Sequence, residues 1–236
     1  RCSRNFVLLK EEKMYYLFWV CFIVINIMVC FSVDKINYKS KKIIYWIFLF
    51  FNALLLALRP INIPDYESYE KIYNYISIGQ NYGFDILARE YYTGVEYGYI
   101  YLTQLIKIFT GNNIRMYFFV IAYTSTVFSI EIMLNIMSKL NILPMNKNVD
   151  VELKIIMSAI FFSYFSMNYQ AIAIRQGISM AVCLLSFYFY LDKKMVKAIL
   201  TIIIAFTIHR MAILGGGLVL VYHFVPSAKT KKTYFQ

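Results

Sequence analysis

The segment from Ala171 to Tyr190 reads AIAIRQGISMAVCLLSFYFY, and it decides the fold class of the chain. A transmembrane helix needs about 20 predominantly apolar residues, which is the length of this segment. Arg175 and Gln176 nevertheless lie a quarter of the way along it. An arginine at the centre of a membrane helix costs about 2.5–3.5 kcal/mol on insertion scales, so it usually faces a cavity, a partner or a substrate. The segment therefore predicts a membrane helix that carries a functional cation.

The rest of the sequence has the same apolar character. Of its 236 residues, 60% are hydrophobic and only 16% are charged. The hydrophobic residues form blocks too long for the stripe of a soluble helix, at about 14–33, 43–58, 116–137, 155–168, 170–191, 198–209 and 211–225. The prediction is an all-α, polytopic transmembrane bundle with about seven crossings. A weaker segment, 98–110, contains Gln104 and Lys107 and is predicted to be a short re-entrant or interfacial helix.

The charged residues predict how the bundle is oriented. The net charge is +11, but the lysines gather in short loops beside apolar blocks, where they set orientation, so no nucleic-acid site is expected. The positive-inside rule places four such clusters in the cytoplasm, at 35–42, 139–154, 193–197 and 229–232. The segment 60–97 holds six acidic residues against Lys71 and Arg89. We therefore expect 59–115 to form an extracytoplasmic loop.

The two ends of the chain and its cysteines complete the domain prediction. Residues 1–13 precede Met14 and are predicted to be a non-native leader, so that 14–236 form a single membrane domain, truncated at its carboxyl end. Three of the four cysteines lie inside apolar blocks without metal-ligand spacing. We therefore expect no metal site, no cofactor and no disulfide framework.

The predicted orientation brings several polar side chains to one face. Arg175 lies in the outer part of the membrane, and the following helix returns His209 and Arg210 to the same side, where the acidic loop also lies. A carboxylate can orient or deprotonate a hydroxyl group, whereas an arginine fork suits a phosphate. Each residue also has a purely structural interpretation. Arg175 could extend to the membrane surface or pair with a carboxylate, His209 could anchor a helix at the membrane–water interface, and Asp65 and Glu96 could be solvated loop acids.

Four motifs carry a resemblance to a known family. In order they are RPINIPDYESY (59–69), VEYGYIYL (95–102), IRQGISMA (174–181) and TIHRMAI (207–213), and together they resemble the EpsG family of polysaccharide polymerases. This family is similar in role to the Wzy polymerases of O-antigen and capsule assembly. The resemblance implies catalytic roles for Asp65, Glu96 and His209, and substrate-binding roles for Tyr69, Gly98, Arg175 and Gln176. Pro64 before Asp65 and Arg210 after His209 depart from the family pattern.

The resemblance also implies an activity and a location. The reaction would be glycosyl transfer on the extracytoplasmic face of the bacterial cytoplasmic membrane, joining oligosaccharide repeat units carried on undecaprenyl pyrophosphate. The product would be exopolysaccharide, capsule or O-antigen, and the partners would be the lipid-linked sugars, the bilayer and other polysaccharide-assembly membrane proteins. The alternative is a flippase or transporter of lipid-linked oligosaccharides, in which Arg175 binds an anionic headgroup. Gathering of the charges on one side favours chemistry over translocation.

Overall fold

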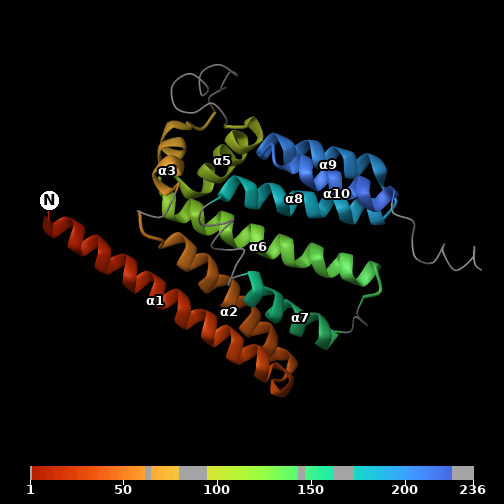
Figure 1. The fold of residues 1–236 in the computed structure, drawn as a ribbon, viewed down its shortest axis with the longest axis horizontal. Coiled ribbons are helices and arrows are strands. Elements are labelled where there is room, and N and C mark those ends of the chain that lie inside the picture. Colours follow the sequence, from red (N-terminus) through yellow and green to blue (C-terminus); the bar gives the residue numbers. More distant parts are fainter. Residues whose placement is uncertain (1, 62–64, 80–94, 143–146, 162–172, 225–236) are drawn as a thin grey trace, which may run out of the picture.

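The computed structural model describes residues 2–61, 65–79, 95–142, 147–161 and 173–224. Within these ranges the regular structure is helical and contains no strand, which confirms the predicted all-α class. The helices are α1 (Cys2–Ser32), the short 3₁₀ helix η1 (Val33–Lys35), α2 (Tyr38–Ala57), α3 (Tyr66–Tyr75), α5 (Tyr97–Thr110), α6 (Ile114–Lys139), α7 (Lys147–Ile160), α8 (Ile174–Leu191), α9 (Met195–Ile208) and α10 (Ala212–Phe224). Figure 1 shows the longer helices running back and forth between two ends of a bundle.

Four segments of the described chain are long and apolar enough to cross a bilayer. They are Lys13–Lys35, Tyr38–Ala57, Ile114–Lys139 and Ile174–Leu191, and α9 is a shorter apolar helix. The predicted count of seven crossings therefore stays a prediction. The predicted boundary at Met14 falls inside α1, which begins at Cys2. The leader and the truncation also stay predictions.

Three of the predicted lysine clusters lie at one end of the bundle. In Figure 1 the α1–α2 connection, the last turn of α6 and the α8–α9 turn all lie on the right. Ion pairs join the helices there: Lys41 of α2 with Glu152 of α7, and Lys139 of α6 with Asp192 after α8. These three clusters therefore lie together at one end of the bundle, and that this end faces the cytoplasm stays a prediction. The fourth cluster, 229–232, lies outside the described residues.

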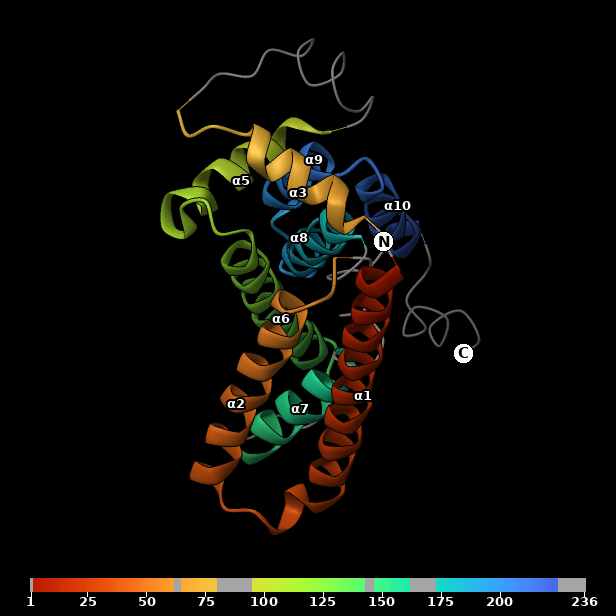
Figure 2. The ribbon, with the colours of Figure 1, turned by 90° about the vertical axis from the view of Figure 1, so that its left-hand side faces the viewer.

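The opposite end is covered by α3 and α5, which Figure 2 shows in front of the ends of α8 and α9. Buried side chains of α3, α5, α6, α8 and α9 form one apolar core at this end. The two polar residues of the weak segment hold α5 against the end of α3. Gln104 donates to the Ser77 carbonyl at 2.8 Å, and the buried Lys107 donates to the carbonyls of Tyr73 and Ile76 at 2.8 and 2.7 Å. The polar groups of both side chains are used in the contact between α5 and the end of α3. That segment 98–110 does not cross the membrane stays a prediction.

Candidate active site

Glu96 is the centre of the candidate site. It precedes α5 in an extended conformation, and its side chain makes no capping hydrogen bond to that helix. Its carboxylate instead accepts from three donors. Oε2 lies 2.8 Å from Nη1 of Arg175, and Oε1 lies 2.9 Å from Nδ1 of His209 and 3.2 Å from the backbone nitrogen of Arg210. One carboxylate thus joins the first turn of α8 to the end of α9.

The three side chains of this cluster are partly buried. Their exposed fractions are 24% for Arg175, 16% for Glu96 and 17% for His209. An ion pair at this depth is screened less by water and salt than a surface pair, while the cluster still opens to solvent. Tyr69 of α3 lies near enough to Arg175 to interact with its charge. Its guanidinium carbon lies 5.9 Å from the centre of the Tyr99 ring.

The contact with Glu96 defines which nitrogen of His209 carries a proton. An ionised carboxylate is an acceptor only, so Nδ1 must donate, and the neutral ring then has a free lone pair on Nε2. The backbone places the ring: His209 is the extended residue that ends α9, and its amide donates to the Ala205 carbonyl at 2.9 Å. Ser179 of α8 donates weakly to the His209 carbonyl, at 3.4 Å. The arrangement is a carboxylate–imidazole pair whose outer nitrogen can exchange a proton.

Gly98 allows the approach of α5 to α9 on which this pair depends. A Cβ atom at this position would lie 2.3 Å from Oγ1 of Thr207, 2.7 Å from its carbonyl carbon and 2.8 Å from its carbonyl oxygen. Thr207 is two residues before His209, and Gly98 is two residues after Glu96. Gly98 of the segment VEYGYIYL is thus in a packing contact that brings Glu96 and His209 together. Its predicted contact with substrate stays a prediction.

Buried tyrosines of α3, α5 and α6 pack beside the site. Tyr99 is 1% exposed and belongs to the core. Its hydroxyl accepts from Tyr117 at 2.8 Å, and Tyr117 is also hydrogen-bonded to Thr103 at 2.9 Å. Burial raises the pKa of Tyr99 well above its ordinary value, so its hydroxyl stays protonated. The Tyr69 ring packs edge-on against Tyr99, with centroids 6.2 Å apart.

Two predicted site residues, Asp65 and Gln176, make no side-chain hydrogen bond or ion pair with Glu96, Arg175 or His209 in the described part of the chain. Asp65 is exposed at the start of α3 with a left-handed φ of 66°, and among the described residues its carboxylate makes no hydrogen bond or ion pair. Its contribution to the structure is to begin the helix that carries Tyr69. Gln176 follows Arg175 but lines a separate apolar groove. The proposed roles of Asp65 and Gln176 therefore stay predictions.

Arg59 was not among the predicted site residues, and it is the largest fully buried side chain of the described part. Its guanidinium lies 3.8 Å from the centre of the Phe118 ring and 5.4 Å from that of Tyr66. Burial lowers the pKa of Arg59 to about 10, which leaves it charged at neutral pH, and its charge acts on Tyr69 and Tyr99. The sequence did offer a signal for this residue: Arg59 ends an apolar block and directly precedes a proline.

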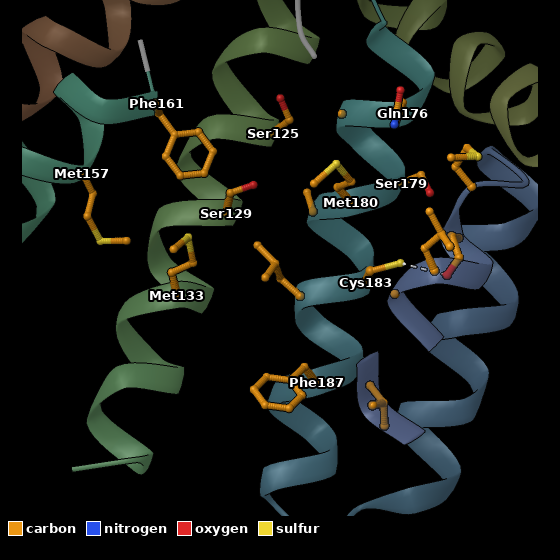
Figure 3. Close-up of a pocket in the computed structure, with 18 of the residues that line it drawn as sticks. Ser125, Ser129, Met133, Met157, Phe161, Gln176, Ser179, Met180, Cys183 and Phe187 are labelled. Carbon is orange, nitrogen blue, oxygen red and sulfur yellow. Dashed lines mark hydrogen bonds between the residues drawn. The ribbon is translucent and has the colours of Figure 1, made fainter. Parts of the chain in front are cut away.

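The groove beside Gln176 has a volume of about 840 Å³ and lies between α6, α7, α8 and α10. Figure 3 shows Gln176 and Ser179 near one end of it and Phe187 at the other. Most of the lining side chains are apolar, and its polar members are Gln176 and the serines Ser125, Ser129 and Ser179. Among the described residues, no group of three or more His, Cys, Asp or Glu side chains is placed to hold a metal ion.

These features define a class of protein: a helical membrane protein with a polar cluster of carboxylate, arginine and histidine at one end of its bundle. The sequence matches the EpsG family over residues 42–236, a range that includes every residue of the cluster, and the chain belongs to that family. No curated protein and no solved structure matches it. The family and the apolar helices together make this a polysaccharide-polymerase-like membrane protein.

Proposed function

We propose that this protein joins oligosaccharide repeat units, carried on undecaprenyl pyrophosphate, into a longer polysaccharide on the extracytoplasmic face of the bacterial cytoplasmic membrane. The observation that carries the proposal is the position of Glu96 between Arg175 and His209. This arrangement places Arg175, whose guanidinium suits a pyrophosphate, close to His209, whose imidazole suits a hydroxyl proton. Both lie at the end of the bundle away from the lysine-rich turns. Family membership supports the polymerase class.

In the proposed reaction, a sugar hydroxyl of one lipid-linked unit attacks the anomeric carbon of the other. The new bond joins that oxygen to the anomeric carbon, and the bond from the anomeric carbon to the pyrophosphate oxygen breaks. The lipid pyrophosphate leaves with the electron pair. Arg175 has five N–H donors in a planar fork, which suits the charge that develops on the leaving pyrophosphate.

The hydroxyl proton is assigned to Nε2 of His209. Both oxygens of Glu96 already accept hydrogen bonds, so Glu96 acts by holding Arg175 and orienting His209. Its negative charge also stabilises the imidazolium that forms when Nε2 takes the proton. This division of roles refines the expectation that Glu96 or Asp65 is the base, because neither the exposed Asp65 nor the occupied Glu96 is as well placed as Nε2.

The test is polymer length and rate in membranes that contain the protein and its lipid-linked repeat units. Arg175→Lys keeps the charge but loses the fork, so we expect it to reduce polymerisation almost as strongly as Arg175→Ala. Glu96→Gln and His209→Gln should leave the protein in the membrane while products stop at single repeat units. Removal of a general base typically costs about 10²- to 10⁴-fold in rate.

Arg210→Gln is the matched control. Arg210 is exposed and donates only its backbone N–H to Glu96, so the substitution removes a neighbouring cation without removing a contact of the site. We expect polymer of normal length from this variant. Long polymer from Arg175→Ala membranes would remove Arg175 from the mechanism, and movement of intact lipid-linked units across the membrane without polymer growth would favour a flippase.

A further inference from the structure

The apolar groove between α6, α7, α8 and α10 begins beside the candidate active site. Gln176, which lines it, is the next residue after Arg175, and Met211 and Ala212 follow the His209–Arg210 pair directly. Ser179 lines the same groove and bonds to the His209 carbonyl. The end of the groove shown with Gln176 in Figure 3 is therefore built on the same backbone as the polar cluster.

The groove extends away from that cluster along α8. From Gln176 to Phe187 the helix rises about 16 Å, at 1.5 Å per residue, which is about half of the roughly 30 Å hydrocarbon core of a bilayer. A groove of this length matches the depth of a single leaflet. Its direction follows a helix that is itself long and apolar enough to cross a membrane.

The chemistry of the lining suits a hydrocarbon chain. Most of the wall is apolar, with methionine, leucine, isoleucine, valine, phenylalanine and alanine side chains that include Met133, Leu184 and Phe187. Two of its serines direct their hydroxyls at backbone carbonyls: Ser125 bonds to Ala122 and Ser179 to His209, each at 3.4 Å. Such a surface offers little to a sugar or an ion, whereas methionines adapt to an irregular apolar ligand.

We infer that this groove binds the polyprenyl chain of a lipid-linked substrate, whose pyrophosphate then lies at Arg175. This inference rests on the proposed function, because a lipid with an anionic head and a long apolar tail is the ligand class that the site and the groove fit together. The groove sets where the chain enters, and it fixes the anomeric carbon beyond the pyrophosphate near His209. Gln176, at the junction, is placed to meet the head of the lipid.

Photolabelling tests the inference without relying on polymerisation. The probe is a polyprenyl phosphate that carries a diazirine in its chain, added to the protein in lipid nanodiscs, with adducts located by mass spectrometry. We expect adducts on groove residues such as Met133 and Phe187. A tenfold excess of undecaprenyl phosphate of equal affinity should reduce these adducts about tenfold by competition.

Lipid-facing side chains supply the control. Phe31 of α1 and Ile203 of α9 are exposed apolar residues outside the groove, so any adducts on them should not respond to the competitor. A second measurement uses a pair of substitutions in α6. Met133→Trp fills the groove and should lower competable labelling at least several-fold, whereas Phe128→Trp, on an exposed position outside the groove, should not.

The outcomes separate this inference from the proposed function. If undecaprenyl phosphate reduces the labelling of the groove but the protein makes no polymer, the polymerase proposal is wrong and the groove assignment is retained. Normal polymerisation with no competable adduct in the groove would overturn the groove assignment alone. Absence of any groove adduct, with adducts present on Phe31, would show that another part of the protein fills the groove and would also overturn it.

Discussion

Replacement of Gly98 by alanine tests whether the site depends on the contact between α5 and α9. The added Cβ would lie 2.7 Å from the carbonyl carbon of Thr207, whereas carbon atoms ordinarily touch at about 3.5 Å or more. The helices would therefore have to separate by about 0.8 Å. The same movement would lengthen the 2.9 Å contact between Glu96 and Nδ1 of His209 to about 3.7 Å, which is too long for a hydrogen bond.

The expected result is a large loss of activity with a small loss of stability. Overpacking costs about 1–3 kcal/mol, and the higher helix propensity of alanine returns up to about 1 kcal/mol. Loss of a hydrogen bond to a charged group is worth about 1.5–3 kcal/mol, or a rate decrease of about 10- to 100-fold. Polymer length and rate in membranes, together with thermal unfolding in detergent, measure the two effects separately.

Two variants sharpen this test. Thr207→Ala removes only Oγ1, and the two backbone atoms still collide with the new Cβ, so the double variant with Gly98→Ala should not recover activity. Gly217→Ala is the control, because a Cβ there would meet nothing within 4 Å. Wild-type polymer from Gly98→Ala would refute the reasoning. A raised KM with unchanged kcat would instead indicate that Gly98 contacts the substrate.

The remaining predictions concern the supports of the site and its orientation. Lys107→Met should destabilise the protein by about 2–6 kcal/mol in chemical unfolding, because two buried carbonyls lose their donor. Arg59→Lys should lose the flat contact with Phe118, and a double-mutant cycle with Phe118→Leu should show coupling of about 0.5–2 kcal/mol, whereas additive effects would refute the contact. A cysteine at Arg210 should react with an impermeant thiol reagent from outside the cell and one at Lys194 should not; labelling of the Lys194 position from outside would reverse the proposed orientation.

The sequence was sufficient to predict the class of fold and the three side chains that the structure brings together, Glu96, Arg175 and His209. A charge inside an apolar block is expensive at membrane depth, so Arg175 was visible without a structure. The lysine-rich turns predicted which helix ends share a side, and that pattern brought His209 to the same end as Arg175. Both inferences use only the spacing of charges along the chain, because a helix that crosses a membrane carries its two ends to opposite sides.

The internal geometry of the site could not be predicted in the same way. That Glu96 contacts both Arg175 and His209 depends on the approach of α5 to α9 at Gly98, which is a property of the packed helices. The burial of Arg59 against Phe118 likewise depends on where α2 ends relative to α6. Segment 98–110 is a further example. Its sequence predicted that it does not cross the membrane, but it could not predict that Lys107 bonds to the end of α3.

The sharing of one carboxylate explains how binding of the lipid pyrophosphate and proton transfer are coupled in the proposed reaction. Oε2 of Glu96 faces Arg175, while Oε1 faces His209 and the amide of Arg210. A pyrophosphate that draws donors of Arg175 toward itself weakens the contact with Oε2 but leaves the two donors on Oε1 in place. The carboxylate charge is then less neutralised by arginine, and its attraction for the proton on His209 increases. In the proposed reaction, binding of the pyrophosphate at Arg175 would thereby favour transfer of the acceptor hydroxyl's proton to Nε2 of His209.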